Sequence, residues 1–306
     1  MKLFIGASLA FGSILVGSPL LALVFGSTFA IILKIPENYI NKSIGTTFLQ
    51  IGIIIIGLTM SASNALEVTA KYFPYISIFV LLVLSAGALL ANLLKVDKKI
   101  GILIASGTAI CGATAMAAVA PLIQAKPRDL LVSLAIIFIF NAIAIGIFPI
   151  IGSSIGMSNE QFGAWIAMAI HDTGSVMGAA MAYGGDTIET AATLKLGRTV
   201  WLIPLIVILG TFYKDKSNSK IKLPIFILVF VIAIIAGTAL NLNQQNLLFL
   251  DFISDTFLVA ALFCIGTQIN SESIKEIDSK TFLLALGLWI IALAVSYTHL
   301  TLPTKV

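Results

Sequence analysis

The stretch GTAICGATAMAAVAP, from Gly107 to Pro121, decides the fold, because small and weakly polar residues interrupt an apolar run there. A second stretch of this kind, AIHDTGSVMGAAMAYGG, runs from Ala169 to Gly185. Paired interruptions within apolar segments are typical of helices that break partway across a membrane. How the rest of the chain surrounds these two stretches predicts the architecture.

The composition of the chain is that of an integral membrane protein. Hydrophobic residues make up 59% and charged residues 10% of the 306 residues, and the mean hydropathy is +1.07. Such a chain has too little polar surface for a soluble globule. Its apolar runs lack the two-residue alternation of a membrane barrel, so the sequence predicts an all-α polytopic membrane protein that contacts the lipid bilayer.

The remaining bulk properties exclude several kinds of site. The net charge of +4 comes from loop lysines, and we interpret it as an orientation signal rather than a nucleic-acid site. Cys111 and Cys264 lie in apolar runs without CxxC spacing, so no metal site, disulfide framework or cofactor is expected. The N-terminal run MKLFIGASLAFGSILVG lacks a cleavage site and is interpreted as a retained first helix.

Apolar runs of spanning length predict about nine membrane helices. They cover Leu3–Val16, Pro19–Leu33, Thr46–Ala62, Pro74–Leu94, Leu130–Ile151, Ala191–Phe212, Leu223–Leu240, Phe252–Ile269 and Phe282–Ser296. Lysines and arginines gather in the loops Lys34–Lys42, Lys95–Lys99, Ala125–Asp129, Lys214–Lys222 and Ser273–Lys280. Because basic loops stay in the cytoplasm, we expect a bacterial inner-membrane protein whose N-terminus is cytoplasmic.

The same rule predicts how the two interrupted segments sit. Ile100–Gln124 has a basic loop on both sides, so it enters from the cytoplasm and returns there. Phe162–Tyr183 lies between two loops without Lys or Arg, so it enters from the outside and returns there. Two arms of about 10 residues reach roughly 15 Å, half the bilayer, so the tips of two opposed re-entrant hairpins would meet near the midplane. Two broken helices that cross there are the alternative.

The sequence also contains segments that resemble one another. Residues 100–151 and 161–212 predict two inverted core units of one transmembrane domain, residues 1–296, which is the architecture of secondary transporters. IGLTMSASNAL at Ile56–Leu66 resembles IGTQINSESI at Ile265–Ile274. The ending SYTHLTLPTKV looks like translated adapter sequence, so residues 297–306 are interpreted as a non-native tail.

Three motifs carry a family resemblance. They are SGTAICGATAMAAVAPLI (residues 106–123), IHDTGSVMGAA (170–180) and LKLGRTVWLIPL (194–205). In this order and spacing they resemble the YeiH family, also called UPF0324, of bacterial inner-membrane proteins, over about residues 46–282. The resemblance implies a polytopic carrier distantly related to the cation/proton antiporter and anion transporter superfamily, with sulfate export as its activity.

The interrupted segments predict an anion site. An unwound tip presents free backbone N–H groups and the positive end of a half-helix, while small residues let a ligand approach the backbone. The candidate substrate-binding residues are Thr108, Cys111, Gly112, Thr114, Thr173, Gly174, Ser175 and Arg198. The alternative is that small residues only allow close helix packing, which is our interpretation for Ala117, Ala118, Ala179 and Ala180.

Ionisable residues near the midplane point to proton coupling or an ion pair. His171 and Asp172 suit a proton relay, since charged groups inside a membrane usually mark a pathway. Alternatively, Asp172 caps the second arm of its hairpin and His171 satisfies a carbonyl. Arg198, about 10 Å deep, needs a carboxylate or an anion, and Asp172 is the expected protein partner. Lys195 either takes part in this ion pair or extends outward to water.

The sequence therefore predicts a secondary transporter of a small inorganic or organic anion, working by alternating access with proton coupling. At 100 mV, inside negative, outward movement of a dianion is favoured by about 4.6 kcal/mol, so sulfate export would need no coupling ion. An anion channel and an intramembrane hydrolase using the HDTGS stretch are the alternatives, and no enzyme is predicted. Homo-oligomerisation is left open. Weaker candidates for the pathway are Thr59, Thr267, Gln268 and Asn270.

Overall fold

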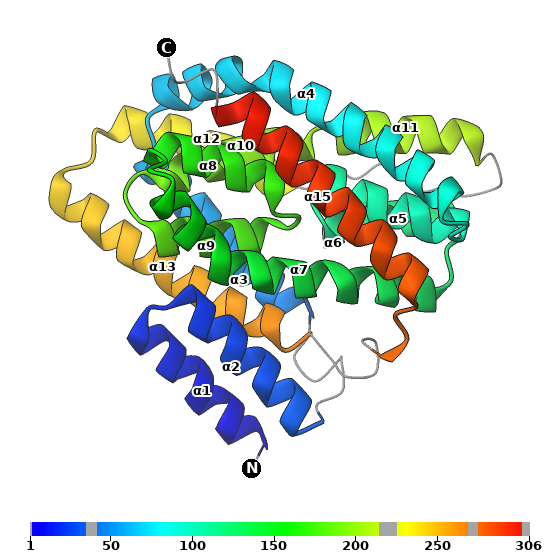
Figure 1. The fold of residues 1–306 in the computed structure, drawn as a ribbon. Helices are drawn as coiled ribbons and strands as arrows, with labels where there is room; N and C mark the ends of the chain where they lie inside the picture. The colour runs from blue at the N-terminus through cyan, green and yellow to red at the C-terminus, as the bar shows by residue number, and fades with distance from the viewer. Residues whose placement is uncertain (1, 35–41, 214–224, 269–274, 302–306) are drawn as a thin grey trace.

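The computed structural model describes residues 2–34, 42–213, 225–268 and 275–301, and the statements below concern these residues (Figure 1). All of their regular structure is helical, so the predicted all-α class is confirmed. Asn270 and residues 302–306 of the predicted tail lie outside the described residues.

The described residues form a series of helices. They are α1 (Lys2–Val16), α2 (Pro19–Ile32), α3 (Lys42–Thr59), α4 (Ala62–Leu93), α5 (Lys98–Ala109), α6 (Ala113–Leu122), α7 (Pro127–Ser154), α8 (Asn159–Ala169), α9 (Thr173–Tyr183), α10 (Thr187–Thr199), α11 (Leu202–Phe212), α12 (Ile225–Leu240), α13 (Gln244–Gly266) and α15 (Ser279–Thr301). Five segments are long and apolar enough to cross a membrane, namely α4, α7, α10 with α11, α13 and α15. Shorter apolar helices account for the other predicted spans.

Several predicted boundaries differ from the structure. The predicted loop before Pro74 is helical, because α4 is one 32-residue helix that contains this proline. Thr238 on α12 accepts a hydrogen bond from the N–H of Ala62 at 2.9 Å, which satisfies one free donor at the start of α4. The span predicted from Ala191 begins at Thr187 instead, and α15 continues past Ser296 to Thr301.

Helices α5 and α6 form hairpin 1, broken at residues 110–112. The ammonium group of Lys99, at the start of α5, donates to the carbonyl of Gln124, just after α6, at 2.7 Å. Both ends of this segment therefore lie at the same side of the molecule. The arms also touch near the tip, where Gly107 faces Met116.

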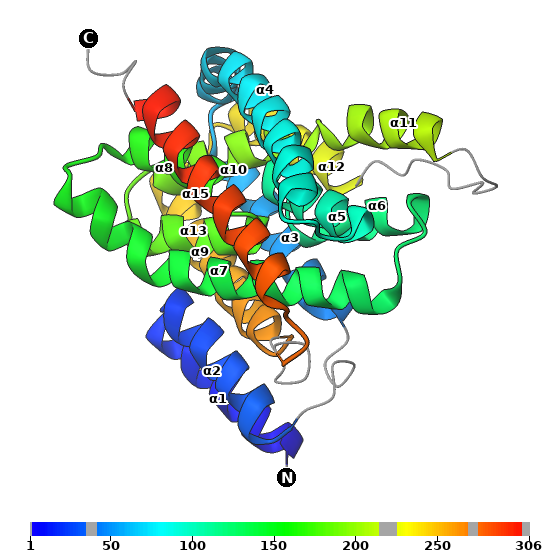
Figure 2. The ribbon, with the colours of Figure 1, turned by 45° about the vertical axis from the view of Figure 1, so that its right-hand side comes forward.

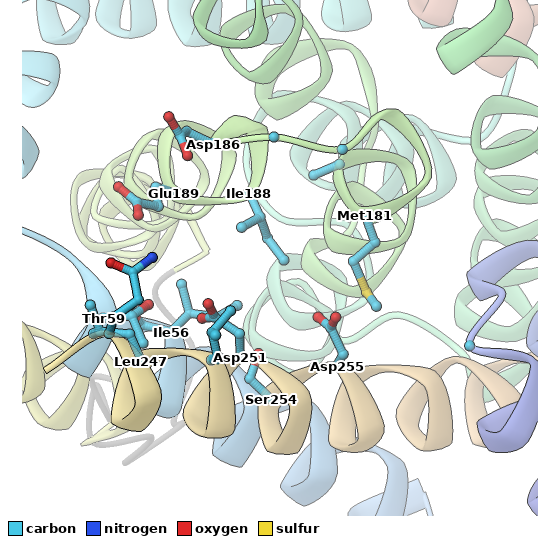
Figure 3. A pocket seen from close by; sticks show the side chains of 16 residues that line it. Ile56, Thr59, Met181, Asp186, Ile188, Glu189, Leu247, Asp251, Ser254 and Asp255 are labelled. Atoms are coloured by element: carbon cyan, nitrogen blue, oxygen red, sulfur yellow. The ribbon is translucent and has the colours of Figure 1, made fainter.

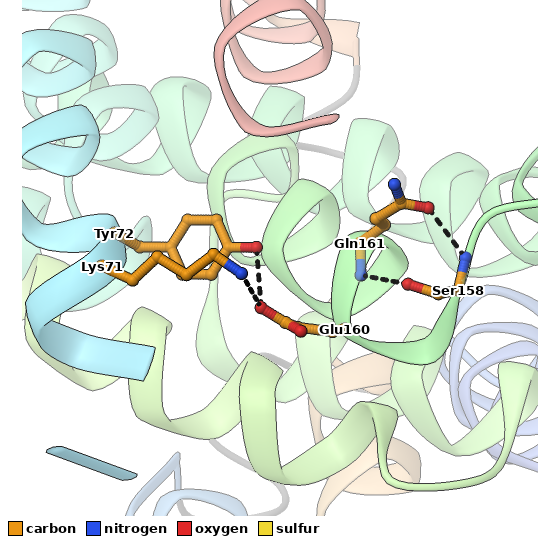
Figure 4. Close-up of polar contacts among 5 residues, drawn as sticks. All are labelled: Lys71, Tyr72, Ser158, Glu160 and Gln161. Atoms are coloured by element: carbon orange, nitrogen blue, oxygen red, sulfur yellow. Dashed lines mark hydrogen bonds and ion pairs between the residues drawn. The ribbon is translucent and has the colours of Figure 1, made fainter. Parts of the chain in front are cut away.

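Helices α8 and α9 form hairpin 2, broken at residues 170–172. A capping box between Ser158 and Gln161 begins α8 (Figure 4). At the end of α9, the Tyr183 hydroxyl donates to the carbonyl of Met157 at 2.5 Å and its ring stacks on Phe162, with centroids 3.9 Å apart. The open ends of the two hairpins face opposite sides in Figure 1. Opposed hairpins are thus confirmed, and the crossing alternative is not what the chain adopts.

The base of hairpin 2 is tied to α4. Lys71 and Tyr72 both donate to the Glu160 carboxylate, at 2.7 and 3.0 Å (Figure 4). Tyr72 is buried here, which explains why the segment before Pro74 remains helical instead of forming a loop.

The helices divide into two groups by their packing. Helices α1, α2, α3, α12 and α13 pack chiefly on one another, and we call them the peripheral body. Helices α4 to α10 and α15 pack chiefly around the hairpins, and we call them the hairpin body. The two bodies meet mainly where α9 lies along α13 and α2 (Figures 1 and 2).

Candidate functional site

The tips of the two hairpins meet in the middle of the hairpin body, and we call this place the junction. A Cβ atom added at Gly112 would lie 3.1 Å from Cβ of Asp172 and 3.2 Å from its backbone nitrogen. Gly112 also has a φ of 57°, a conformation that residues with a side chain rarely adopt. Both the close approach and the backbone angle therefore require glycine at the tip of hairpin 1.

The C-terminal end of α8 is satisfied entirely by side chains of other helices. Its last four carbonyl groups have no partner within the helix. Arg198 donates to Ala167 and Met168 at 2.9 and 2.6 Å, and Lys195 donates to Ile170 at 2.6 Å. Trp289 on α15 donates to Ala169 at 3.1 Å. Two cations thus sit at the negative end of a helix dipole.

Arg198 also joins the two hairpins directly. Its second terminal nitrogen donates to the carbonyl of Thr108, at the end of α5, at 2.7 Å. The side chain is fully buried, and its guanidinium lies 5.1 Å from the ring centroid of Phe79. One guanidinium therefore holds the C-terminal ends of both first arms.

The expected ion pair between Arg198 and Asp172 is wrong. No ion pair within 4.0 Å joins Asp172 to Arg198 or Lys195 in the described part of the chain. Because α10 begins at Thr187, Arg198 lies about 16 Å along it, level with the carbonyl ends of α5 and α8. Lys195 is fully buried as well, so the outward-extending alternative is also wrong.

Asp172 instead caps α9, as the structural alternative predicted. Its carboxylate accepts hydrogen bonds from the backbone N–H of Ser175 at 2.8 Å, the Ser175 hydroxyl at 2.7 Å and the Asn141 amide. The same Asn141 accepts from the backbone N–H and the Nδ1 of His171, at 3.1 and 2.9 Å. Asn141 on α7 therefore fixes both polar residues of the second tip.

Some of the other predicted site residues lie at the junction and some lie away from it. The Thr108 hydroxyl is buried at the junction without a partner, and Cys111 is buried beside Lys195 and Arg198. Thr114 is exposed on the first turn of α6 and Thr173 is half-buried.

Gly174 packs against side chains of the peripheral body, Ile265 and Leu49. Of the weaker candidates, Thr267 donates to the Cys264 carbonyl at 2.7 Å. The junction therefore gathers Thr108, Cys111, Gly112, Lys195 and Arg198 around the second tip.

A second polar feature, the outer pocket, lies between the two bodies (Figure 3). It is a cavity of about 450 Å³ at the end of the molecule where hairpin 2 is open. Four carboxylates line it: Asp186 and Glu189 from the start of α10, and Asp251 and Asp255 from α13. Thr59, a weaker candidate of the sequence, lines it too. The described residues of the lining include no lysine or arginine, so the pocket favours cations.

Sequence reasoning missed the acidic residues of this pocket and the part played by Asn141. Asp255 lies inside the span predicted from Phe252, and Asp251 lies four residues earlier on the same helical face. An ionisable residue within a span was a sufficient signal for Asp255. Nothing in the sequence places Asn141 or Trp289 against the second tip, because both come from other helices.

Comparisons with known proteins agree on one family. Residues 4–285 match the family described as "Conserved hypothetical protein 698". The chain is 37% identical over 276 residues to a UPF0324 membrane protein of Photobacterium profundum, covering 90% of this chain and 84% of that protein. It is 36% identical over 276 residues to one of Bacteroides thetaiotaomicron, covering 90% and 83%.

A UPF0324 membrane protein of Vibrio parahaemolyticus is 35% identical over 291 residues, which cover 94% of each chain. No solved structure matches the chain. The relatives are named as membrane proteins, and their names state no substrate.

Proposed function

Because the chain belongs to the UPF0324 family of membrane proteins, we propose a function for it from the junction: a secondary transporter that binds a small anion between the two hairpin tips. The sulfate ion is the first substrate to test, since the residues at the junction suit a small oxyanion. We place the protein in the bacterial inner membrane with the basic, open end of hairpin 1 in the cytoplasm.

The charge balance of the junction carries the proposal. Lys195 and Arg198 supply two positive charges and Asp172 supplies one negative charge, with His171 counted as neutral. The four half-helix ends contribute about +0.5 for each N-terminus and −0.5 for each C-terminus, so they cancel. Two minus one leaves an excess of about one positive charge in a buried place. An unpaired buried charge is costly, and a bound anion would neutralise it.

The donors left free at the junction support the same assignment. The Nε of Arg198 and the hydroxyl of Thr108 are both buried, and neither has a hydrogen-bond partner among the described residues. The N-cap residue of α6, Gly112, has no side chain that could accept from the first N–H groups, whereas α9 is capped by Asp172. Hairpin 1 therefore presents at the junction a positive helix end that no carboxylate caps, with Cys111 hydrogen-bonded to the backbone of Ala115, and such an end is suited to an anion.

Proton coupling, if the transporter uses it, suits the outer pocket better than the second tip. His171 and Asp172 are held by Asn141 and Ser175. The carboxylates of Glu189, Asp251 and Asp255 instead line a cavity between the two bodies. Acidic groups at such a place could load protons from outside and release them as the bodies move.

The hydrolase alternative finds little support in the geometry. The Ser175 hydroxyl donates to Asp172 at 2.7 Å, while Nδ1 of His171 faces the amide oxygen of Asn141. A nucleophilic serine instead needs the histidine as its hydrogen-bonded base. The neighbouring residues of the HDTGS stretch thus point to helix capping.

The proposed function is tested by radiolabelled sulfate counterflow into proteoliposomes, with phosphate, sulfite and a small organic sulfonate as competitors. We expect saturable exchange that protein-free liposomes lack, and a change of rate under an imposed pH gradient if protons are coupled. A channel would give flux without counterflow. The absence of exchange with every anion, from protein whose fold is intact, would contradict an anion carrier.

A further inference from the structure

A separate groove lies beside the first arm of hairpin 1. It is a cavity of about 500 Å³ between α4, α5 and α11. Helix α11 packs chiefly on α6, so it stands away from α4 and α5 (Figure 2). Protein interiors are close-packed, and a space of this size between membrane helices needs an occupant.

The walls and the mouth of the groove differ in chemistry. The walls are mostly apolar and include Ile102, Leu205 and Leu209. The polar groups Asn92, Lys98 and Tyr213 lie where α4 ends, α5 begins and α11 ends. From Lys98 to Ser106, the groove follows α5 for eight residues, or about 12 Å. An apolar slot with a polar mouth at a membrane surface fits one amphiphile.

The charge at the mouth selects the headgroup. Lys98 is exposed and forms no hydrogen bond or ion pair within the described residues. Lys95 and Lys99 lie within the same five-residue loop, which contains only Asp97 as an acid. The basic loop places this end in the cytoplasm, where anionic lipids attract lysines and tyrosine rings lie at the interface.

We propose that this groove is a binding site for one anionic phospholipid of the cytoplasmic leaflet. One of its acyl chains lies between α4, α5 and α11, and its phosphate meets Lys98, with Tyr213 and Asn92 as further donors. Because α5 is the first arm of hairpin 1, the bound lipid contacts the element that carries Thr108 to the junction. The site does not depend on which anion the protein transports.

Native mass spectrometry of the full chain, titrated with phosphatidylglycerol or phosphatidylcholine, tests this site. We expect one phosphatidylglycerol to bind more tightly than phosphatidylcholine. Lys98→Gln should weaken phosphatidylglycerol binding about five-fold, the effect of one lysine near an anionic headgroup, and weaken phosphatidylcholine binding less, because the choline cation offsets the charge of its phosphate. Lys95→Gln is the matched control, since Lys95 belongs to the same loop but does not line the groove.

A second pair of variants tests the groove itself without changing charge. Ala88→Phe fills the groove and should remove the tight lipid, whereas Leu89→Phe, on the adjacent exposed position outside the groove, should not. Equal binding of both lipids, equal losses from Lys98→Gln and Lys95→Gln, or a tight lipid retained by Ala88→Phe would overturn the proposal. A second chain that occupies the groove, seen as a dimer lost in Ala88→Phe, would overturn it too.

Discussion

Thr108 has two polar groups at the junction, its backbone carbonyl and its hydroxyl, but only the carbonyl forms a described hydrogen bond. Its carbonyl accepts a hydrogen bond from Arg198, whereas its hydroxyl is buried without a partner. A buried hydroxyl without a hydrogen bond is costly, and an anion that accepted a hydrogen bond from it would remove that cost. If an anion fills the junction, this hydroxyl is a direct donor that the folded protein itself does not need.

Thr108→Val removes this donor and keeps the shape of the side chain. We expect the apparent affinity for the transported anion to fall about tenfold or more, the contribution of a hydrogen bond to a charged group. Thermal stability should be unchanged or higher, because no protein hydrogen bond is lost. Concentration-dependent counterflow and thermal unfolding in detergent measure the two effects.

Thr193→Val is the matched control for this substitution. The Thr193 hydroxyl is also buried without a partner, but it lies on α10 away from the face that carries Arg198. Its loss should leave the affinity unchanged. Equal affinities for wild type and Thr108→Val would remove this hydroxyl from the anion site.

At the scale of elements, the two hairpins meet through a glycine that has no room for a side chain. Gly112→Ala would strain the backbone by about 1–3 kcal/mol and push the first tip away from Asp172. We expect lower thermal stability and the loss of anion exchange, because the charges of the junction would separate. Thermal unfolding and counterflow of the same preparation check both parts.

Gly156→Ala separates backbone strain from tip contact. Gly156, in the turn between α7 and α8, has a similar φ of 67°, but an added Cβ would meet nothing within 4 Å. It should lose about 1–2 kcal/mol of stability and retain exchange. Wild-type exchange by Gly112→Ala would show that close contact of the tips is not needed for transport.

At the scale of the whole molecule, the packing inside the peripheral body differs from the packing between the two bodies. Within the peripheral body, a Cβ at Gly26 would meet the carbonyl of Phe263, so backbones touch there. Between the bodies, Gly178 on α9 faces the end of the Leu262 side chain on α13. Contacts through flexible apolar side chains allow sliding, which alternating access needs.

A short cross-link between the bodies should therefore stop transport. In a variant without the native cysteines, Gly178→Cys with Leu262→Cys joins α9 to α13 across the two bodies. Gly52→Cys with Leu258→Cys is the matched pair within the peripheral body, since a Cβ added at Gly178 or Gly52 would lie 3.1 or 2.9 Å from a methyl carbon of the leucine concerned. We expect only the first cross-link to abolish counterflow, with recovery on reduction.

Both cross-links would be compared before and after reduction in the same vesicles. Full exchange through a completely cross-linked Gly178–Leu262 pair would mean that these bodies do not move against each other. Inhibition by both pairs would show that cross-linking itself inactivates the protein.

The sequence by itself determined the membrane class, because composition and apolar length are read along the chain. Its loop charges favoured two opposed hairpins, but they left two crossing broken helices as an alternative that only the structure excluded. It also singled out Asp172 and Arg198, but it paired them wrongly. Only the tertiary structure decided that Arg198 reaches the carbonyl ends of both first arms and that Asn141 fixes the second tip.

The same limit explains why the sequence predicted neither the outer pocket nor the groove between α4, α5 and α11. Each is lined by helices distant in sequence, α3, α10 and α13 in the first case and α4, α5 and α11 in the second. Hydropathy and charge patterns show which residues enter the membrane. Which of them face one another depends on helix packing and on small shifts of helix starts, such as Thr187 instead of Ala191.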